Sequence, residues 1–205
     1  MAIKRIVKVG FFLMSIIGIP MIFEISSILH IWLGTPPDNA AMFSAFFILA
    51  LLFDSMTIGL THVNNAIGNI GKYILTLNTP KFITFFFVFV ALKFDASLYV
   101  IGIIYVFVEA VTAFVRVPLI KEQAGLDVSN FFKTVVFREI FPAFLCTMTC
   151  LLSVTFFSFQ WRFVLTFFLS ASIYTAAMYF WGLTSKERKI IIELFDAVKA
   201  KFINR

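Results

Sequence analysis

Charged residues are scarce in this sequence. Asp, Glu, Lys and Arg make up 14% of its 205 residues, whereas a soluble globular domain carries about 25%. Hydrophobic residues make up 61%, and the mean hydropathy is +0.98. We therefore expect lipid to be the solvent around this chain, and each bilayer crossing takes about 20 apolar residues. Chain length and the number of apolar stretches both predict about six crossings.

Catalytic and metal-binding patterns are also lacking. The two cysteines, Cys146 and Cys150, lie one helical turn apart in an apolar stretch without the Cys/His spacing of a zinc site, so we interpret them as packing residues. The sequence has no Gly-rich phosphate loop, no His-x-x-x-His pair, no Ser beside a base and no clustered carboxylate pair. We expect no enzyme activity, no metal site and no cofactor.

The predicted fold is all-α, a polytopic membrane protein with a six-helix transmembrane bundle in residues 1–183. The spans are predicted at residues 9–33, 40–63, 74–92, 98–120, 140–159 and 163–183. The third span holds Pro80 and Lys81, so it is either kinked or begins later.

The segments between and after the spans have patterns of their own. Residues 64–73 are predicted to form a polar, Gly-containing connection, and residues 127–133 a short amphipathic segment at the membrane surface. Residues 184–205 form a second predicted unit, a cytoplasmic amphipathic helix at the membrane interface. Thr184 and Glu187 have capping-box spacing, and the apolar residues that follow lie on one helical face.

The positive charges predict the orientation of the chain. A net charge of +6 is compatible with a nucleic-acid partner, but most Lys and Arg residues flank apolar segments, which is an orientation signal and predicts no such partner. With both termini in the cytoplasm, thirteen of the 17 positive residues lie on the inner side: Lys4, Arg5, Lys8, Lys72, Lys121, Lys133, Arg138, Lys186, Arg188, Lys189, Lys199, Lys201 and Arg205.

Ionisable residues inside the predicted spans are the candidate functional residues. They are Glu24, Asp54, Lys81, Glu109 and Arg116. A charge at the centre of a bilayer costs about 3 kcal/mol on insertion scales. Each of these side chains therefore needs a partner, a water-filled cavity or a route to the lipid headgroups.

Spacing along the chain suggests how some of them are placed. Glu109 and Arg116 are two helical turns apart, so they share a face at a separation of about 11 Å. Alternatively, Arg116 extends to the cytoplasmic surface while Glu109 bonds a neighbouring helix. Asp54 and His62 also share a face, which suits a proton or cation relay, although we favour a polar seam between helices.

Two prolines affect the interpretation of the remaining candidates. Glu24 follows Pro20 by one turn, a pattern found at bent transporter helices, but a position near the outer headgroups is the favoured interpretation. Lys81 follows Pro80 directly, and a later start of this helix would return it to the inner headgroups.

Short motifs along the chain occur in a particular order. They are Ile-Trp-Leu-Gly-Thr-Pro-Pro at 31–37, Asn-Asn-Ala-Ile-Gly-Asn-Ile at 64–70 with Tyr73, Glu109 and Arg116 with Pro118, Lys121 and Gly125-Leu126, and Gly-Leu-Thr-Ser-Lys-Glu-Arg at 182–188. In this order the chain resembles bacterial polysaccharide transport proteins, the O-antigen and capsule flippase branch of the multidrug/oligosaccharidyl-lipid/polysaccharide exporter superfamily.

The resemblance implies a function. Such flippases have about twelve to fourteen helices in two bundles around a central cavity, and the likeness covers the C-terminal six. It implies half of a transporter in the bacterial inner membrane, with a complementary N-terminal half as partner and membrane lipids around it. The implied substrate is an oligosaccharide linked to undecaprenyl pyrophosphate, whose tail stays in the bilayer. Arg116 and Lys81 would meet the pyrophosphate.

Two other functions stay open. A drug or cation exporter of the same superfamily would use Asp54 and Glu109 as coupling acids. A non-transporting membrane subunit, or an inert fragment, would use neither.

Overall fold

The computed structural model describes residues 2–68, 70–159, 161–190 and 193, and every regular element within these ranges is helical. The elements are α1 (Ala2–Leu33), α2 (Ala40–Ser55), α3 (Ile58–Ile67), α4 (Ile70–Lys93), α5 (Leu98–Ala124), α6 (Val128–Phe131), the π-helical η1 (Phe132–Val136), α7 (Phe137–Phe156), α8 (Arg162–Ala177) and the π-helical η2 (Met178–Gly182). The all-α prediction is confirmed for this part of the chain.

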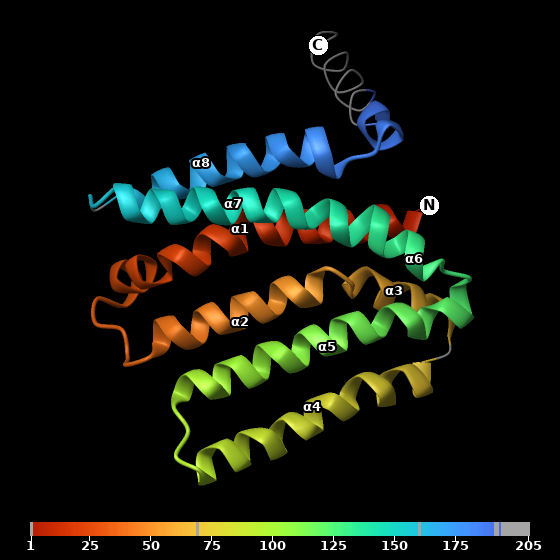
Figure 1. Cartoon of the computed structure of the whole chain (residues 1–205), viewed down its shortest axis with the longest axis horizontal. Helices are drawn as coiled ribbons and strands as arrows, with labels where there is room; N and C mark the ends of the chain where they lie inside the picture. Colours follow the sequence, from red (N-terminus) through yellow and green to blue (C-terminus); the bar gives the residue numbers. More distant parts are fainter. Residues whose placement is uncertain (1, 69, 160, 191–192, 194–205) are drawn as a thin grey trace, which may run out of the picture.

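The long helices lie roughly side by side (Figure 1). Helices α1, α7 and α8 all pack against one another, and from α1 the bundle continues as a row through α2 and α5 to α4. The start of α1 and the end of α8 lie at the same end of the bundle, which we call the Lys4 end; the opposite end, where α1 finishes, we call the Trp32 end.

Helices long and apolar enough to cross a membrane make up most of the described chain. They are Ile3–Leu33, Tyr73–Lys93, Leu98–Lys121, Val128–Phe156 and Arg162–Gly182, and the pair α2 and α3 adds a sixth if it counts as one span. This arrangement is consistent with a multi-pass membrane protein.

The second predicted span is not continuous. Helices α2 and α3 meet at a bend of 49°. The backbone N–H groups of Met56 and Thr57 turn back to the carbonyls of Phe53 and Asp54, which tightens the end of α2 into a 3₁₀-like turn. The prediction of one unbroken helix over 40–63 is therefore wrong at this point.

The polar connection predicted at 64–73 is mostly helical. Helix α3 continues to Ile67 and α4 begins at Ile70, so the turn is short and passes through Gly68 at a φ of 87°. The hydroxyls of Thr61 and Tyr73, 2.9 Å apart, tie α3 to α4, and Tyr73 is buried. These contacts keep the segment helical despite its polar composition.

The two remaining segments outside the predicted spans have different outcomes. Residues 127–133 do not form a separate surface helix, because α6 runs through η1 into α7 and Phe131 is fully buried in the core. Thr184 does cap a helix over 185–190, with its hydroxyl accepting from the N–H of Glu187. The rest of the predicted amphipathic helix at 184–205, apart from residue 193, lies outside the described residues.

Close helix contacts depend on small residues. In lipid, association is driven by packing and polar contacts more than by hydrophobicity, so backbones that approach closely are favoured. A Cβ at Gly59 would lie 2.8 Å from Val7 of α1, and a Cβ at Gly102 would lie 2.1 Å from the ring of Phe46 on α2. Gly102 thus sets the separation of α2 and α5.

Gly102→Ala should disturb this contact. The added methyl group must displace the Phe46 ring, and overpacking of this kind costs about 1–3 kcal/mol. Gly10→Ala is the matched control, because nothing lies within 4 Å of its Cβ position, and replacing a helical Gly there should be neutral or stabilise by up to about 1 kcal/mol. Thermal unfolding in detergent measures both, and equal melting temperatures would contradict this account of the α2–α5 contact.

Candidate substrate cavity

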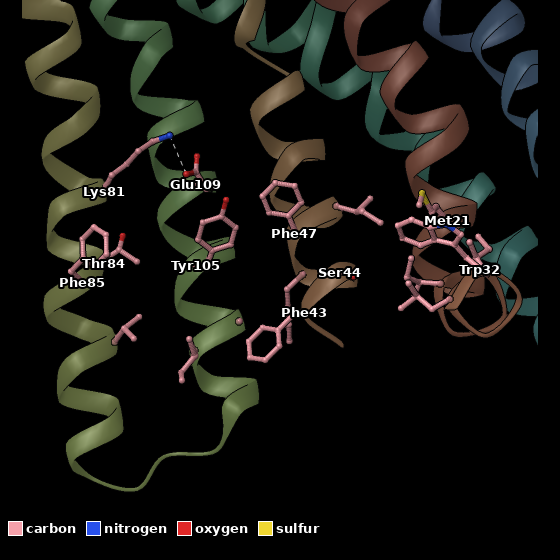
Figure 2. Close-up of a pocket in the computed structure, with 18 residues that line it drawn as sticks. Met21, Trp32, Phe43, Ser44, Phe47, Lys81, Thr84, Phe85, Tyr105 and Glu109 are labelled. Carbon is pink, nitrogen blue, oxygen red and sulfur yellow. Dashed lines mark ion pairs between the residues drawn. The ribbon is translucent and has the colours of Figure 1, made fainter. Parts of the chain in front are cut away.

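A cavity of about 970 Å³ lies between α1, α2, α4 and α5. Figure 2 shows that its wall is built mainly from apolar and aromatic side chains, including Trp32, Phe43, Phe47 and Phe85. The two charged groups that line it, Lys81 and Glu109, lie together on one side of the lining residues, while Trp32 and Phe43 line it farther toward the Trp32 end. The cavity is therefore amphipathic, with a long apolar part and one charged end.

Lys81 and Glu109 form an ion pair between α4 and α5. The Nζ–Oε1 distance is 3.1 Å, and the Lys81 side chain is 46% exposed whereas that of Glu109 is 10% exposed. Helix α4 begins at Ile70 and continues through Pro80, so Lys81 lies near the middle of the helix. The alternative of a later helix start is therefore wrong. Glu109 does bond a neighbouring helix, as one interpretation expected.

Arg116 and Asp54 form a second ion pair, between α5 and the end of α2. The distance from Nη2 to Oδ1 is 2.5 Å, and Nη1 also lies 3.4 Å from both the Asp54 carbonyl and the Thr57 hydroxyl. Because the bend frees carbonyls at the negative end of the α2 dipole, a cation is favoured there. Arg116 is 6% exposed, so the interpretation that it extends to the membrane surface is wrong.

The structure does not form the relay between Asp54 and His62 that was the less favoured alternative. The two residues lie on different helices that meet at 49°, so the eight-residue spacing does not place them on one face. His62 is exposed, and Asp54 is committed to Arg116. Asp54 belongs to a polar seam between α2 and α5, so the favoured interpretation of a seam holds for Asp54 but not for His62.

Glu24 lies away from the cavity, between α1 and α8. It is fully buried, and its two oxygens accept from Nε and Nη2 of Arg162 at 2.9 and 3.0 Å. The hydroxyls of Thr166 and Ser27 add bonds of 2.9 and 3.2 Å. Glu24 is therefore paired with donors inside the bundle, and its predicted position near the outer headgroups stays a prediction. Its partner Arg162 begins α8, and spacing along the sequence could not predict a contact between residues this far apart.

Two features were missed by the sequence analysis. Lys8 is 3% exposed and pairs with Glu187 at 2.9 Å, while also donating to the Gly182 carbonyl at 3.1 Å. Glu139 is fully buried in α7, and neither of its oxygens has a hydrogen-bond partner among the described residues. Its spacing from Cys146 and Cys150, seven and eleven residues, is a signal that could have placed it on the packed face.

Comparison of the chain with protein-family models, with curated proteins and with solved structures gives no match. The likeness to polysaccharide transport proteins therefore stays an expectation from the ordered motifs.

Removing the cation that neutralises Glu24 should destabilise the bundle. Arg162→Met leaves a buried carboxylate without a counter-charge, which costs about 3–5 kcal/mol. Adding Glu24→Gln to the same chain removes the stranded charge, so the double variant should recover most of the loss. Chemical unfolding in detergent measures each step of the cycle. Additive losses from the two substitutions would contradict the pairing.

The Glu187 contacts predict how the end of the bundle responds to acid. Partial burial raises the pKa of the Glu187 carboxyl, but the N–H and hydroxyl of Thr184 and the ammonium of Lys8 outweigh burial, so the pKa lies below its ordinary value. A lowered folded-state pKa means that the stabilisation is present above about pH 4.3 and is lost as the pH falls through the folded pKa.

Amide protection factors of residues 184–190 test this expectation. Protection should fall when the pH is lowered through this range in the wild type. It should already be low and nearly independent of pH in Glu187→Gln, whereas Lys186→Ala should behave like the wild type. Wild-type protection that persists well below the range would show that the carboxylate does not hold this segment.

Proposed function

We propose that this chain takes part in translocating a lipid-linked oligosaccharide across a bacterial inner membrane, as the C-terminal bundle of a larger polysaccharide transporter. The observation that supports the proposal best is the cavity of about 970 Å³ with an apolar wall and a single charged end. A lipid-linked glycan has the same division, with a hydrocarbon tail joined to an anionic phosphate group.

The wall and the charged end have separate roles in this proposal. Phe43, Phe47 and Phe85 provide apolar surface for the polyprenyl chain. The ammonium of Lys81 provides positive charge for the pyrophosphate. Its side chain is far more exposed than that of Arg116, the other cation paired with an acid on a neighbouring helix in this region. Arg116 is held by Asp54 and Thr57 and lies outside the cavity lining, so Lys81 is the cation that the substrate meets first.

Positive charge at the Lys4 end supports the predicted orientation. Lys4, Arg5, Lys8 and Lys186 line a pocket of about 310 Å³ there. Because positive residues are retained in the cytoplasm, this end faces inward, and the Trp32 end faces outward. The start of the chain and the segment after η2 then both lie in the cytoplasm.

A drug or cation exporter is the competing function. It would use Asp54 and Glu109 as free coupling acids, but both are paired with cations of other helices. This pairing favours the glycan substrate, whose phosphate can exchange with Glu109 for Lys81.

Lys81→Ala tests the proposal in cells that export a surface polysaccharide. Loss of one charge-assisted contact of about 1.5–3 kcal/mol should lower export about 10- to 100-fold. Lys93→Ala is the matched control, because Lys93 is an exposed cation at the end of the same helix and should leave export unchanged.

Deletion of the reading frame tests the function as a whole. We expect export of the surface polysaccharide to fail and an upstream frame to encode six or eight further apolar segments. Normal export in the deletion strain, or proton-dependent drug efflux with unchanged glycan, would reject the proposal.

A further inference from the structure

Glu139 differs from every other buried carboxyl group in the described chain. Glu24 is equally buried, yet Arg162, Thr166 and Ser27 supply it with four hydrogen bonds. Glu139 is also fully buried, but both of its oxygens lack a hydrogen-bond partner. An ionised carboxylate without donors would cost several kcal/mol more in this setting than a neutral acid. The contrast shows that the two sites suit different forms of the same side chain.

The charged and titratable groups around Glu139 come from three elements. Lys8 of α1, Glu187 of the segment after η2 and Tyr174 of α8 all lie within electrostatic range of Glu139. Lys8 is bonded to Glu187 at 2.9 Å, so its ammonium is already neutralised. Glu139 therefore has a cation nearby that is engaged with a different acid.

The backbone around this group is irregular. The π-helical turn η1 ends just before Glu139, and η2 ends at Gly182, whose carbonyl accepts from Lys8 at 3.1 Å. Single π-helical turns inside α-helices are frequent at functional sites. Thr134 of η1 lines the same pocket as Lys8 and Glu187, and the last residue of η2 accepts a hydrogen bond from Lys8.

We propose that Glu139 is a proton-binding site, with Lys8 exchanging between Glu187 and Glu139 according to whether the proton is present. With the proton bound, Glu139 is a neutral acid and Lys8 pairs with Glu187. When the proton leaves to water, the Glu139 carboxylate takes the Lys8 ammonium. Glu187 is then freed into the pocket that it lines with Lys4, Arg5 and Lys186, where its charge stays compensated.

The proton site links two regions of the bundle. Release of Lys8 from Glu187 also removes one of the contacts that hold the Thr184 cap. Proton exchange at Glu139 therefore changes the attachment of the segment that follows η2. This inference does not depend on the transported substrate.

Infrared spectroscopy of the full chain in lipid bilayers at pH 7 tests the proton site. Glu139→Gln, which has the shape of the neutral acid, should remove the carboxylic-acid C=O band and leave carboxylate absorption unchanged. Glu24→Gln is the matched control for burial, and it should lower carboxylate absorption only. If Glu139→Gln lowers carboxylate absorption instead, Glu139 is ionised and the proposal is overturned.

Glu187→Gln tests the exchange of Lys8. Without Glu187, Lys8 should pair with Glu139, which then loses its proton. The carboxylic-acid band should therefore disappear at pH 7, although residue 139 is still Glu. Lys186→Ala, a neighbouring charge that makes no such pair, should leave the band intact. A band that persists in Glu187→Gln would overturn the exchange. Because both readouts are spectroscopic, failure here and failure of polysaccharide export are separate results.

Discussion

Hydrocarbon offers no water to a charged side chain, so ion pairs between helices neutralise charges inside the described part of this bundle. Arg162 of α8 pairs with Glu24 of α1, Arg116 of α5 with Asp54 of α2, and Lys81 of α4 with Glu109 of α5. The contacts α1–α8, α2–α5 and α4–α5 therefore each include an ion pair. Losing one partner is more harmful than losing both, because a stranded charge keeps its desolvation cost. The pairs thus specify which helices are neighbours.

Hydropathy predicted most of the helices because a bilayer demands long apolar segments whatever the fold. It also located the ionisable residues inside the predicted spans, since charges stand out in apolar runs, but not the buried Lys8 and Glu139, which lie just outside those spans. The ion-pair partners of the residues inside the spans could not be predicted from the sequence. Glu24 and Arg162, for example, are separated by 138 positions in the chain. Helical periodicity relates only residues within one helix, and these contacts join different ones.

The sequence-based predictions were wrong where a contact with a residue distant in the sequence determines the local structure. The break after α2 is stabilised by Arg116 of α5, so the sequence around Asp54 contains no local signal that predicts the break. Residues 64–73 have turn-like composition, but the Thr61–Tyr73 contact keeps them mostly helical. Glu139 lies one residue before the span predicted at 140–159, so it was not counted among the ionisable residues inside the spans, although its spacing from Cys146 and Cys150 marks the packed face.

Helix α4 lies at the edge of the row and packs mainly against α5. Within the described residues, the Lys81–Glu109 bond is the one ion pair that α4 makes. An anion that reaches the ammonium of Lys81 must compete with Glu109 for it. An anion bound there would therefore break the ion pair between α4 and α5, so occupancy of the cavity would loosen the attachment of this outermost helix.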